Sequence, residues 1–572
     1  MAGGVHMGSR VVVNLGVQQF DKVIEEKKFY IDKTGFIKEW WETGADVTII
    51  TRPRRFGKTL NMSMTECFFS NRYASRGDLF EGLSIWKEAA YRNLQGTFPV
   101  IFLSFAGIEA GGYEDMAYMI SDEIAKLYGE NRYLLEGTLL NKSEREYFEH
   151  IKPGMEGRMA AGAIRRMAGF MQRYYGKNVI IILDEYDTPM QAAWLSGYWE
   201  EAVSFFCTLF GSTFKNNPYL SKGLITGITR VAKESIFSSM NNPDVITTTS
   251  NEYARYFGFL EEEVFAALDE AGLGSERQSV KKWYDGFTFG KYTDIYNPWS
   301  IASFLRKNGE YDAYWTNTSS NELINSLVKK GNSDIKQTME ILLQGGSFET
   351  ELDEQIAFHQ LDGDVHAVWS LLLATGYLRV GQVLRVGEQK TKLYTVSLTN
   401  MEVRNMFAKM IRGWFHGSAG GYYNEFIHAL LNDNVRKMNT FMNKVALNTF
   451  NSFDSGNKPS NQTEPERFYH GFVLGMVVSL ADTYKVRSNR ESGYGSYDVM
   501  LEPLDKKGKA FIFEFKVLDT DEDEQTLEDT LANAHIQINE KQYEAELAAA
   551  GFGREQIRKY GFAFQGKTCL IG

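Results

Sequence analysis

Short apolar runs alternate with helical patterns through the first part of the chain. Val179–Leu183 is a run of five apolar residues, which fits a central parallel strand covered on both faces. Tyr113–Tyr128 has the apolar spacing of a helix. Further strand candidates are Asp46–Thr51, Phe98–Phe105 and Gly223–Ile228. Strands that alternate with helices predict a parallel α/β sheet over residues 11–250.

The pattern becomes mainly helical after residue 250. Val368–Asn400 contains a helix followed by two strands, and a second helix is predicted over Glu402–Phe415. This order of elements is typical of a winged-helix lid, and an unspecified α+β linker domain is the alternative. Residues 251–450 are therefore predicted to form a helical and winged-helix-like lid or linker region.

A mixed pattern follows the polar, linker-like stretch Ser452–Glu464. It predicts a third α/β domain over residues 451–572. The expected elements are a helix over Arg467–Thr483, strands near Asp498–Pro503 and Ala510–Val517, and one helix over Leu527–Ala549. The acidic run Asp519–Glu524 is predicted to be a solvated loop, with a metal site as the alternative.

Composition and charge narrow the class of protein. A chain of 572 residues is too long for one hydrophobic core. The three cysteines lie far apart, which favours reduced thiols in a cytoplasmic protein and argues against a zinc cluster. Since no apolar run reaches about 18 residues and no secretory signal is visible, no membrane partner is expected. The net charge of −11 does not suggest nucleic acid, but it leaves room for a local basic groove.

A phosphate-binding loop is predicted where the first strand meets a helix. Gly57-Lys58-Thr59 follows that strand, and Lys58 would reach the β- and γ-phosphates while Thr59 would hold Mg²⁺. Arg52 stands where such a motif usually has its first glycine. The predicted nucleotide-binding residues of the loop are Arg54, Arg55, Phe56, Gly57, Lys58, Thr59 and Leu60.

An acidic pair after a buried strand supplies the second half of an ATPase site. Asp184 would bind Mg²⁺ through water, and Glu185 would polarise the attacking water. An exposed acidic turn is the alternative. Arg230 follows the next strand and is a candidate sensor of the γ-phosphate, with an ordinary surface arginine as its alternative.

A second candidate site lies near the C-terminus. Glu514 and Lys516 are two residues apart on one strand and therefore share a face, and Asp498 lies on or beside the strand before it. Burying such groups is costly unless they are paired or bind an ion. The order of these residues is that of Mg²⁺-dependent phosphodiesterases of the restriction-endonuclease fold. Asp498 and Glu514 would hold the metal with the Phe515 carbonyl, and Lys516 would position or deprotonate water. A Glu514–Lys516 surface pair on an edge strand is the alternative.

These motifs resemble a known bacterial family, the AAA-ATPase-like proteins fused to a PD-(D/E)XK nuclease-superfamily domain. The resemblance covers the chain from about Val13 to Phe564. The segments that carry it are Phe29–Thr34, Arg52–Leu60, Ile182–Asp187, Thr226–Arg230, Lys233–Ser238, Trp283–Phe287 and Tyr296–Ser300.

The resemblance implies roles for several further residues. Arg230 would be a sensor arginine, and Arg52 is no departure because the family's loop is similar to RPRRFGKT. Glu466 matches an additional acidic residue of the nuclease site, and Gln537 matches a polar residue that lines it. Ser496 stands where relatives often have arginine. Tyr30, Asp32 and Lys33 are expected near the nucleotide, and Asp285 and Asn297 are expected to have structural roles at a domain junction.

The sequence thus predicts an α/β protein with a P-loop NTPase parallel-sheet core, a helical and winged-helix-like lid, and a C-terminal restriction-endonuclease-like α/β domain. ATP and Mg²⁺ are the expected cofactors, and ATP binding would gate cleavage of DNA or RNA. The alternatives are a nucleotide-controlled switch or scaffold that binds a partner without cleaving it, and a plain ATPase with a structural C-terminal fold. A homo-oligomer remains open. Candidate nucleic-acid contacts are Lys485, Arg487, Arg490, Tyr494 and Tyr497.

Overall fold

The computed structural model describes residues 13, 16–229, 240, 243–318, 321–331, 333–353, 361, 364–414, 420–453, 463–492, 495–519 and 524–572. The chain forms two compact units. The first contains Met1–Ser319 and Glu349–Val403, and the second contains Ser320–Phe348 and Arg404–Gly572. The three-domain division expected from the sequence stays a prediction, and the two units share residues 251–450 between them.

A five-stranded parallel sheet forms the core of the first unit, which confirms the predicted α/β class. Its strand order is β2-β3-β4-β1-β5. The strands are β1 (Val47–Thr51), β2 (Val100–Ser104), β3 (Val179–Asp184), β4 (Leu220–Gly227) and β5 (Asp244–Ile246). Every residue of β3 is buried, as its unbroken apolar run predicts for an interior strand.

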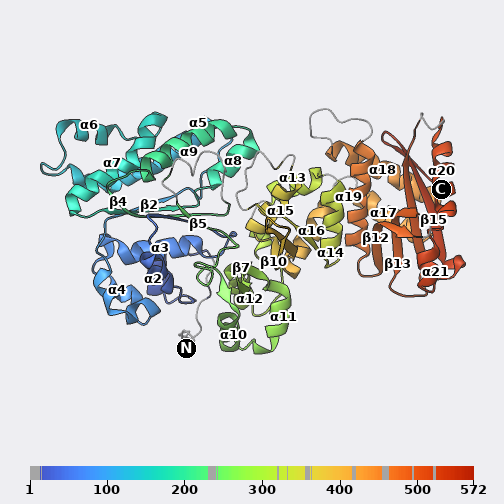
Figure 1. Cartoon of the computed structure of the whole chain (residues 1–572), viewed down its shortest axis with the longest axis horizontal. Helices are drawn as coiled ribbons and strands as arrows, with labels where there is room; N and C mark the ends of the chain where they lie inside the picture. Colours follow the sequence, from blue (N-terminus) through green and yellow to red (C-terminus); the bar gives the residue numbers. More distant parts are fainter. Residues whose placement is uncertain are drawn as a thin grey trace. The chain divides into compact units, whose positions relative to one another are not determined.

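Helices cover both faces of this sheet. Figure 1 shows α5, α7 and α9 together on one face and α2 and α3 on the other. The helices of this part are α1 (Phe20–Glu25), α2 (Gly35–Glu42), α3 (Lys58–Phe69), α4 (Ala89–Leu94), α5 (Tyr113–Glu130), α6 (Lys142–His150), α7 (Gly157–Tyr175), α8 (Thr188–Ser196) and α9 (Trp199–Phe214).

A small antiparallel sheet with the order β6-β8-β7 follows along the chain. Its strands are β6 (Phe259–Leu260), β7 (Phe287–Phe289) and β8 (Tyr292–Tyr296), and the helices beside it are α10 (Glu261–Glu270), α11 (Arg277–Tyr284) and α12 (Pro298–Arg306). Tyr284, Tyr296 and Phe304 belong to its buried core. The hydrophobic pattern does not reveal these strands because they are too short to show an alternation.

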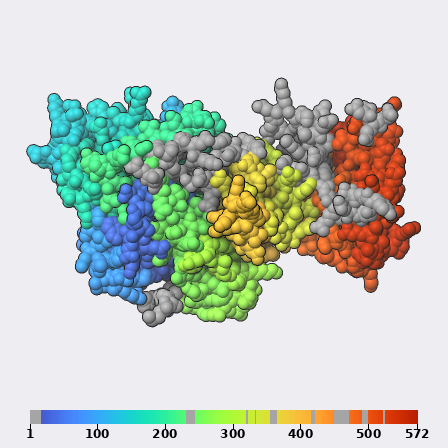
Figure 2. Space-filling model, in the orientation of Figure 1, coloured from blue at the N-terminus to red at the C-terminus, as the bar shows by residue number. Residues whose placement is uncertain are grey.

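The predicted order of helix, hairpin and helix is present after residue 364. The elements are α15 (Val365–Ala374), β10 (Leu378–Val386), β11 (Thr391–Leu398) and α16 (Met401–Trp414), and β9 (Ser347–Thr350) pairs at the outer side of β11. Most of β10 is exposed, and this hairpin reaches the surface shown in Figure 2. The winged-helix assignment itself stays a prediction.

Glu402, near the start of α16, is a fully buried acid. Its carboxylate accepts hydrogen bonds from the Ser300 hydroxyl at 2.8 Å and from the backbone N–H groups of Trp315 and Thr316. Burial raises the pKa of Glu402 to about 7, although these donors favour the ionised form. Glu402 therefore ties α16 to α12 and to the segment after residue 314.

The second unit combines helices with a five-stranded mixed sheet of order β12-β13-β14-β15-β16. Its strands are β12 (Tyr484–Ser492), β13 (Gly495–Pro503), β14 (Ala510–Val517), β15 (Ile557–Gln565) and β16 (Thr568–Ile571). Besides most of α16, its helices are α13 (Glu322–Lys330), α14 (Ser333–Leu343), α17 (Gly420–Leu431), α18 (Val435–Phe453), α19 (Thr463–Leu480), α20 (Leu527–Glu540) and α21 (Ala545–Ala549).

The edge strand β16 is protected by side chains of α18. Asn439 donates to the carbonyl of Ile571 at 2.7 Å and accepts from its N–H at 2.8 Å. Asn443 makes the same pair of bonds to Cys569, at 2.7 and 2.9 Å. Two asparagines one helical turn apart thus satisfy an edge that would otherwise be open to another strand.

The single C-terminal helix expected over Leu527–Ala549 is wrong. The helix ends at Glu540, and a short turn separates α20 from α21. Gln542 takes the left-handed conformation in that turn, with φ +52°, and the Tyr543 side chain that follows it is buried. The break is therefore set by tertiary packing and carries no glycine or proline signal. No helix in the described ranges is long and apolar enough to cross a membrane.

The Glu402 carboxylate predicts a specific pH dependence of stability. Because its pKa is about 7 in the folded chain and 4.5 in a model peptide, the native state binds more protons between these values, so stability falls as pH rises through 7. The full effect is about 3 kcal/mol. Denaturant unfolding between pH 5 and 8 should show Glu402→Gln gaining stability relative to the parent as pH increases. A difference between the two proteins that is constant with pH would contradict this role.

Candidate functional site

The loop between β1 and α3 has the geometry of an anion-binding turn. Arg55 has φ +66° and Gly57 has φ +78°, and Gly57 caps the start of α3. Glycine adopts this left-handed conformation at little cost. The first N–H groups of a helix have no intrahelical partners, so a helix start after such a turn can bind an anion.

Lys58 places a buried ammonium group at this helix start. Its side chain is 3% exposed, and its Nζ donates to the carbonyls of Arg52 at 3.1 Å and Pro53 at 3.0 Å. Burial lowers the pKa of Lys58, and the nearby carboxylates of Glu185, Asp187 and Asp184 oppose that shift. A buried cation bonded to neutral carbonyls complements a phosphate group.

The predicted Mg²⁺ ligands from two elements are in direct contact. The Thr59 hydroxyl donates to Asp184 Oδ2 at 2.7 Å, and the Thr226 hydroxyl donates to Asp184 Oδ1 at 2.6 Å. Asp184 is fully buried, so the alternative of an exposed acidic turn is wrong. Burial raises the pKa of Asp184. Carboxylate and hydroxyl oxygens are donors that suit Mg²⁺, so these residues fit the ion.

Glu185 follows directly and is half-buried. Its backbone has φ +49°, a conformation that is uncommon for residues other than glycine. The Thr188 hydroxyl lies 3.4 Å from its Oε2. This strained position turns Glu185 away from the strand direction, beside Asp184 at the carboxyl end of β3. Its role toward water stays a prediction.

Asp187 is an important buried residue that the sequence analysis did not single out. Its Oδ2 accepts from the backbone N–H groups of Ile228 and Thr229 at 3.0 and 2.9 Å and from the Thr229 hydroxyl at 2.9 Å. Gln191 also donates to it at 2.9 Å. Asp187 thereby fixes the chain that leaves β4. A second acid two residues after an acidic pair was the available signal.

The predicted sensor Arg230 lies outside the described residues. The residue before it, Thr229, is described and donates its hydroxyl to Asp187. Gln191, which also contacts Asp187, accepts from Arg54 at 3.4 Å. A polar chain therefore joins the phosphate-binding loop to the end of β4.

The other loop residues divide between exposed and structural positions. Phe56 is fully buried and packs at 4.7 Å against the ring of Phe287, so its side chain anchors the loop. Arg55 is exposed, with its guanidinium 4.4 Å from the ring centre of Trp299. Leu60 is half-buried on the first turn of α3. Among the loop side chains, Thr59 contacts Asp184 directly, and Lys58 is affected by the charge of Asp184.

Arg52 explains why this loop does not need its usual first glycine. The side chain is fully buried, and its guanidinium donates to the carbonyls of Thr51 at 2.9 Å, Thr247 at 2.6 Å and Glu252 at 3.2 Å. It also lies 4.6 Å from the ring centre of Phe289. Arg52 therefore supports the loop from the protein side.

Asn297 connects the loop to the next subdomain. Its side-chain oxygen accepts from the N–H groups of Trp299 and Ser300 and so caps α12, while its Nδ2 donates to the Arg54 carbonyl at 3.3 Å. Capping fixes the asparagine in the orientation that reaches the loop. These contacts support the structural junction role that was expected for this residue.

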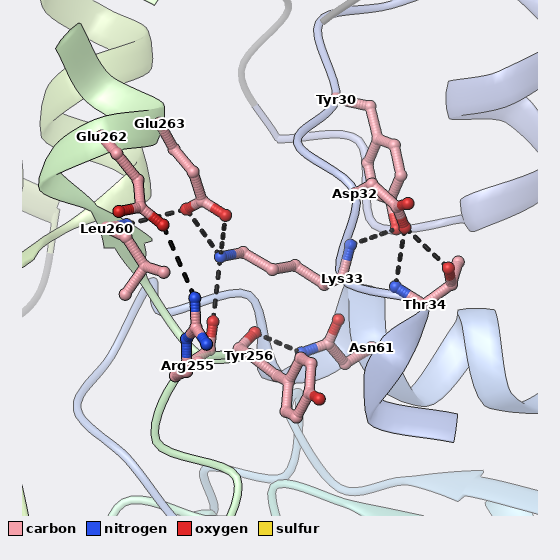
Figure 3. Close-up of polar contacts among 10 residues, drawn as sticks. All are labelled: Tyr30, Asp32, Lys33, Thr34, Asn61, Arg255, Tyr256, Leu260, Glu262 and Glu263. Carbon is pink, nitrogen blue, oxygen red and sulfur yellow. Dashed lines mark hydrogen bonds and ion pairs between the residues drawn. The ribbon is translucent and has the colours of Figure 1, made fainter. Parts of the chain in front are cut away.

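Polar contacts of the motif Phe29–Thr34 are shown in Figure 3. Those that the structure describes do not involve the phosphate-binding loop. Lys33 Nζ contacts both carboxylate oxygens of Glu263, at 2.8 and 2.7 Å, and the Arg255 carbonyl at 3.0 Å. Asp32 accepts from the N–H and hydroxyl of Thr34. Tyr30 contacts the sulfur of Met64 on α3, at 3.5 Å. The motif thus joins α3 to the start of α10.

The second candidate site lies on the sheet of the second unit. β13 and β14 are antiparallel with Val499 opposite Phe513, and this register puts Asp498 opposite Glu514. The N–H of Phe515 donates to Asp498 Oδ2 at 2.7 Å. Because β14 lies between β13 and β15, the alternative of a surface pair on an edge strand is wrong.

The acidic pair carries the electrostatic signature of a cation site. Glu514 is 3% exposed, and its Oε2 has no hydrogen-bond partner in the described part of the chain. Burial raises the pKa of Glu514 to about 8, helped by the charge of Asp498, and raises the pKa of Asp498 to about 6. Two facing carboxylates that resist ionisation fit a divalent metal ion, which would supply the missing positive charge.

Gln537 and Lys516 complete the described part of this site. Gln537, on α20, donates to Glu514 Oε1 and lies 3.0 Å from the Tyr543 hydroxyl, so it orients the carboxylate. Lys516 is half-buried, two residues from Glu514 on the same strand. Glu466 belongs to α19, but its side chain lies outside the described residues.

Two expectations around this site are corrected. Glu524 is not part of a solvated loop, because it is buried and accepts from Thr530 and Asn533, each at 2.7 Å. Arg487 is not a free cation for nucleic acid, since Glu502 and Glu546 both pair with it. Lys485 is exposed, whereas the side chains of Arg490, Tyr494, Ser496 and Tyr497 lie outside the described residues.

The support that Arg52 gives to the loop predicts its contribution to stability. Arg52→Gly restores the usual residue of a phosphate-binding loop, yet it should lower the free energy of unfolding by about 3 kcal/mol, because three carbonyls lose a buried charged donor. Denaturant unfolding measures the loss, with the exposed Arg158→Gly as the matched control. Equal effects of the two changes would contradict the assignment.

Known protein families match both the N-terminal part and the C-terminal part of the chain. Residues 14–237 match a family described as predicted AAA-ATPase, and residues 464–572 match the PD-(D/E)XK nuclease superfamily. A protein described as an uncharacterised protein in the vnfD 5′ region of Azotobacter chroococcum mcd 1 is 26% identical to this chain over 404 residues, which is 69% of each protein. The parallel sheet and the mixed sheet are consistent with a P-loop core and a PD-(D/E)XK fold. The chain therefore combines a predicted AAA-ATPase-like domain with a C-terminal domain of the PD-(D/E)XK nuclease superfamily.

Proposed function

We propose that this protein binds and hydrolyses ATP and thereby gates a Mg²⁺-dependent phosphodiesterase that cleaves nucleic acid, with DNA as the first candidate. The observation that carries the proposal is the facing Asp498–Glu514 pair, in which the buried Glu514 keeps an oxygen without a hydrogen-bond donor in the described part of the chain. An inert structural fold has no need for two facing acids with raised pKa values.

ATP would bind at the start of α3. Lys58 would exchange its loop carbonyls for phosphate oxygens, while the loop N–H groups hold the same phosphates. Thr59 and Asp184 would hold Mg²⁺, which offsets charge on the phosphates when bound. Glu185 would orient water for attack on the γ-phosphate, and Arg230 would respond to the loss of that phosphate.

In the nuclease site, different residues would likewise bind the metal ion, act on the water and orient a metal ligand. Asp498 and Glu514 would hold Mg²⁺ with the Phe515 carbonyl, and the ion would stabilise charge on the scissile phosphate. Lys516 would position the attacking water or accept its proton. Gln537 keeps Glu514 in the orientation that faces Asp498.

Chain connectivity supports gating. The chain passes between the two units after Ser319, after Phe348 and after Val403. Glu402 stands beside the third passage and is bonded to Trp315 and Thr316, a few residues before the first. A change in the first unit on nucleotide binding would therefore reach two of the connecting segments through one carboxylate.

A switch or scaffold that binds a partner without cleaving it is the second candidate. The observation that favours it is the pairing of Arg487 with Glu502 and Glu546, which removes one cation from the expected nucleic-acid path. In that case the endonuclease-like domain would recognise its partner without phosphate chemistry, and nucleotide binding at Lys58 would control assembly.

If Glu514 binds a metal ion, replacing it should change the melting temperature in different ways with and without that ion. Glu514→Gln should keep or raise the melting temperature without metal, because the variant removes a buried acid whose ionisation is unfavourable. It should also lose the stabilisation that Mn²⁺ or Mg²⁺ gives the parent. Thermal unfolding with and without metal tests this, with the exposed Glu528→Gln as control. Equal stabilisation of the parent and Glu514→Gln would count against the site.

Cleavage is the direct test of the proposed function. The parent protein with Mg²⁺ and ATP should cut linear, circular or single-stranded DNA, or RNA. Glu514→Gln should reduce cleavage by at least about 100-fold, since a metal ligand and its charge are lost. Lys58→Ala should change the ATP dependence of cleavage, whereas the exposed Lys87→Ala should not.

The same assay separates the candidate functions. If the parent cuts none of these substrates but still binds ATP, the nuclease proposal is wrong. A change of assembly state in Lys58→Ala, measured by light scattering, would then support the switch.

A further inference from the structure

Three carboxylates from separate elements converge in the subdomain around β8. Glu261 is the first residue of α10, Asp285 follows α11, and Asp294 lies on β8. Each offers an oxygen, and these oxygens all lie within 4.8 Å of one another. Such a group belongs to neither the nucleotide site nor the nuclease site described above.

Lys281 neutralises only part of this negative charge. Its Nζ contacts Glu261 and lies 2.9 Å from Asp294 Oδ1, but it is 3.9 Å from Asp285 Oδ2. With all three carboxylates ionised, the one ammonium leaves two negative charges, the amount that one divalent cation balances. The Tyr296 hydroxyl, 3.3 Å from Glu261 Oε2, adds a neutral donor.

Asp285 supplies the independent sign of a missing ligand. It is 8% exposed, and its Oδ1 has no hydrogen-bond partner among the residues that the structure describes. A buried carboxylate oxygen without a donor is costly, and coordination to a metal ion removes that cost. The Lys281 ammonium lies nearer to Glu261 and Asp294 than to Asp285, so a divalent cation would add the attraction that the Asp285 carboxylate lacks.

The backbone holds Asp285 in this position. Gly286, with φ +112°, would place a Cβ 2.2 Å from the carbonyl of Thr399, so the turn is closely packed. The N–H of Asp285 donates to the Lys281 carbonyl at 3.1 Å, which continues α11 up to this residue. The carboxylate is therefore presented by a rigid turn, as a preorganised ligand requires.

We propose that Glu261, Asp285 and Asp294 bind one hard divalent cation, Ca²⁺ or Mg²⁺. All three ligands are oxygens, which these ions prefer. The side chains of Glu261 and Asp294 are 33% and 41% exposed, so water can complete the coordination. The ion would join α10, α11 and β8, and it would brace the strand β7, whose Phe287 packs against Phe56 of the phosphate-binding loop.

Terbium luminescence provides a local readout, because the Tyr296 hydroxyl lies 3.3 Å from Glu261 and its ring can sensitise a lanthanide bound there. The experiment uses the full chain carrying Asp498→Asn and Glu514→Gln, without nucleotide, so that the nuclease site does not contribute. Tb³⁺ should bind this parent, and Ca²⁺ or Mg²⁺ should displace it. The ion that displaces Tb³⁺ at the lower concentration is the preferred one.

Substitutions in this background decide between a cation site and a closed ion-pair network. Asp285→Asn should weaken Tb³⁺ binding by about tenfold or more, and Glu261→Gln should do the same. Asp269→Asn, an exposed acid on α10 that pairs with Arg277, is the matched control and should have no effect. Lys281→Met should tighten binding, because a competing cation is removed.

Any of three results would overturn the proposal. The first is the absence of a sensitised Tb³⁺ signal from the parent. The second is equal Tb³⁺ affinity in the parent, Asp285→Asn and Glu261→Gln. Weaker binding in Lys281→Met would also contradict it, since a closed network would lose its organising lysine.

Discussion

The pairing of β1, β3 and β4 in one parallel sheet is the constraint on which the nucleotide site depends. Parallel strands end at the same edge, so Thr59, Asp184 and Thr226 meet although they are far apart in the sequence. Two hydroxyl groups then hold the buried Asp184 carboxylate at 2.6 and 2.7 Å. Without this convergence, a buried acid and a buried lysine in one loop region would be a large cost with no compensation.

Several charged side chains of this fold are buried, which costs free energy. Hydrogen bonds to backbone groups offset part of that cost. Arg52 and Lys58 donate to carbonyls, whereas Glu402 and the Oδ2 atom of Asp187 accept from N–H and hydroxyl donors. Charged groups bonded to the backbone fix the chain more strongly than neutral pairs do. The same residues therefore position the phosphate-binding loop, the exit of β4 and the start of α16.

In the endonuclease-like domain, by contrast, hydrogen bonds do not fully offset the cost of bringing two acidic groups together. Asp498 and Glu514 face each other with raised pKa values, and Glu514 keeps an oxygen without a donor in the described chain. Such an arrangement lowers the stability of the metal-free protein and favours cation binding. The proposed function at this site would thus reduce stability, a relation that is common where a site must hold like charges together.

The sequence by itself determined the α/β class and the strands β1 to β4, β13 and β14. It also indicated that Thr59 and Asp184 meet, and that Asp498 and Glu514 do, because these depend on local patterns and on which end of a strand a residue follows. The sequence did not reveal that Arg52 supports the loop or that Asp187 fixes the chain after β4. It also did not reveal that Glu502 and Glu546 pair with Arg487, or that the helix ends before Tyr543. Each of these depends on which distant groups meet a buried side chain. Only the tertiary structure decides that, since burial and hydrogen-bond partners are set by packing between segments far apart in the chain.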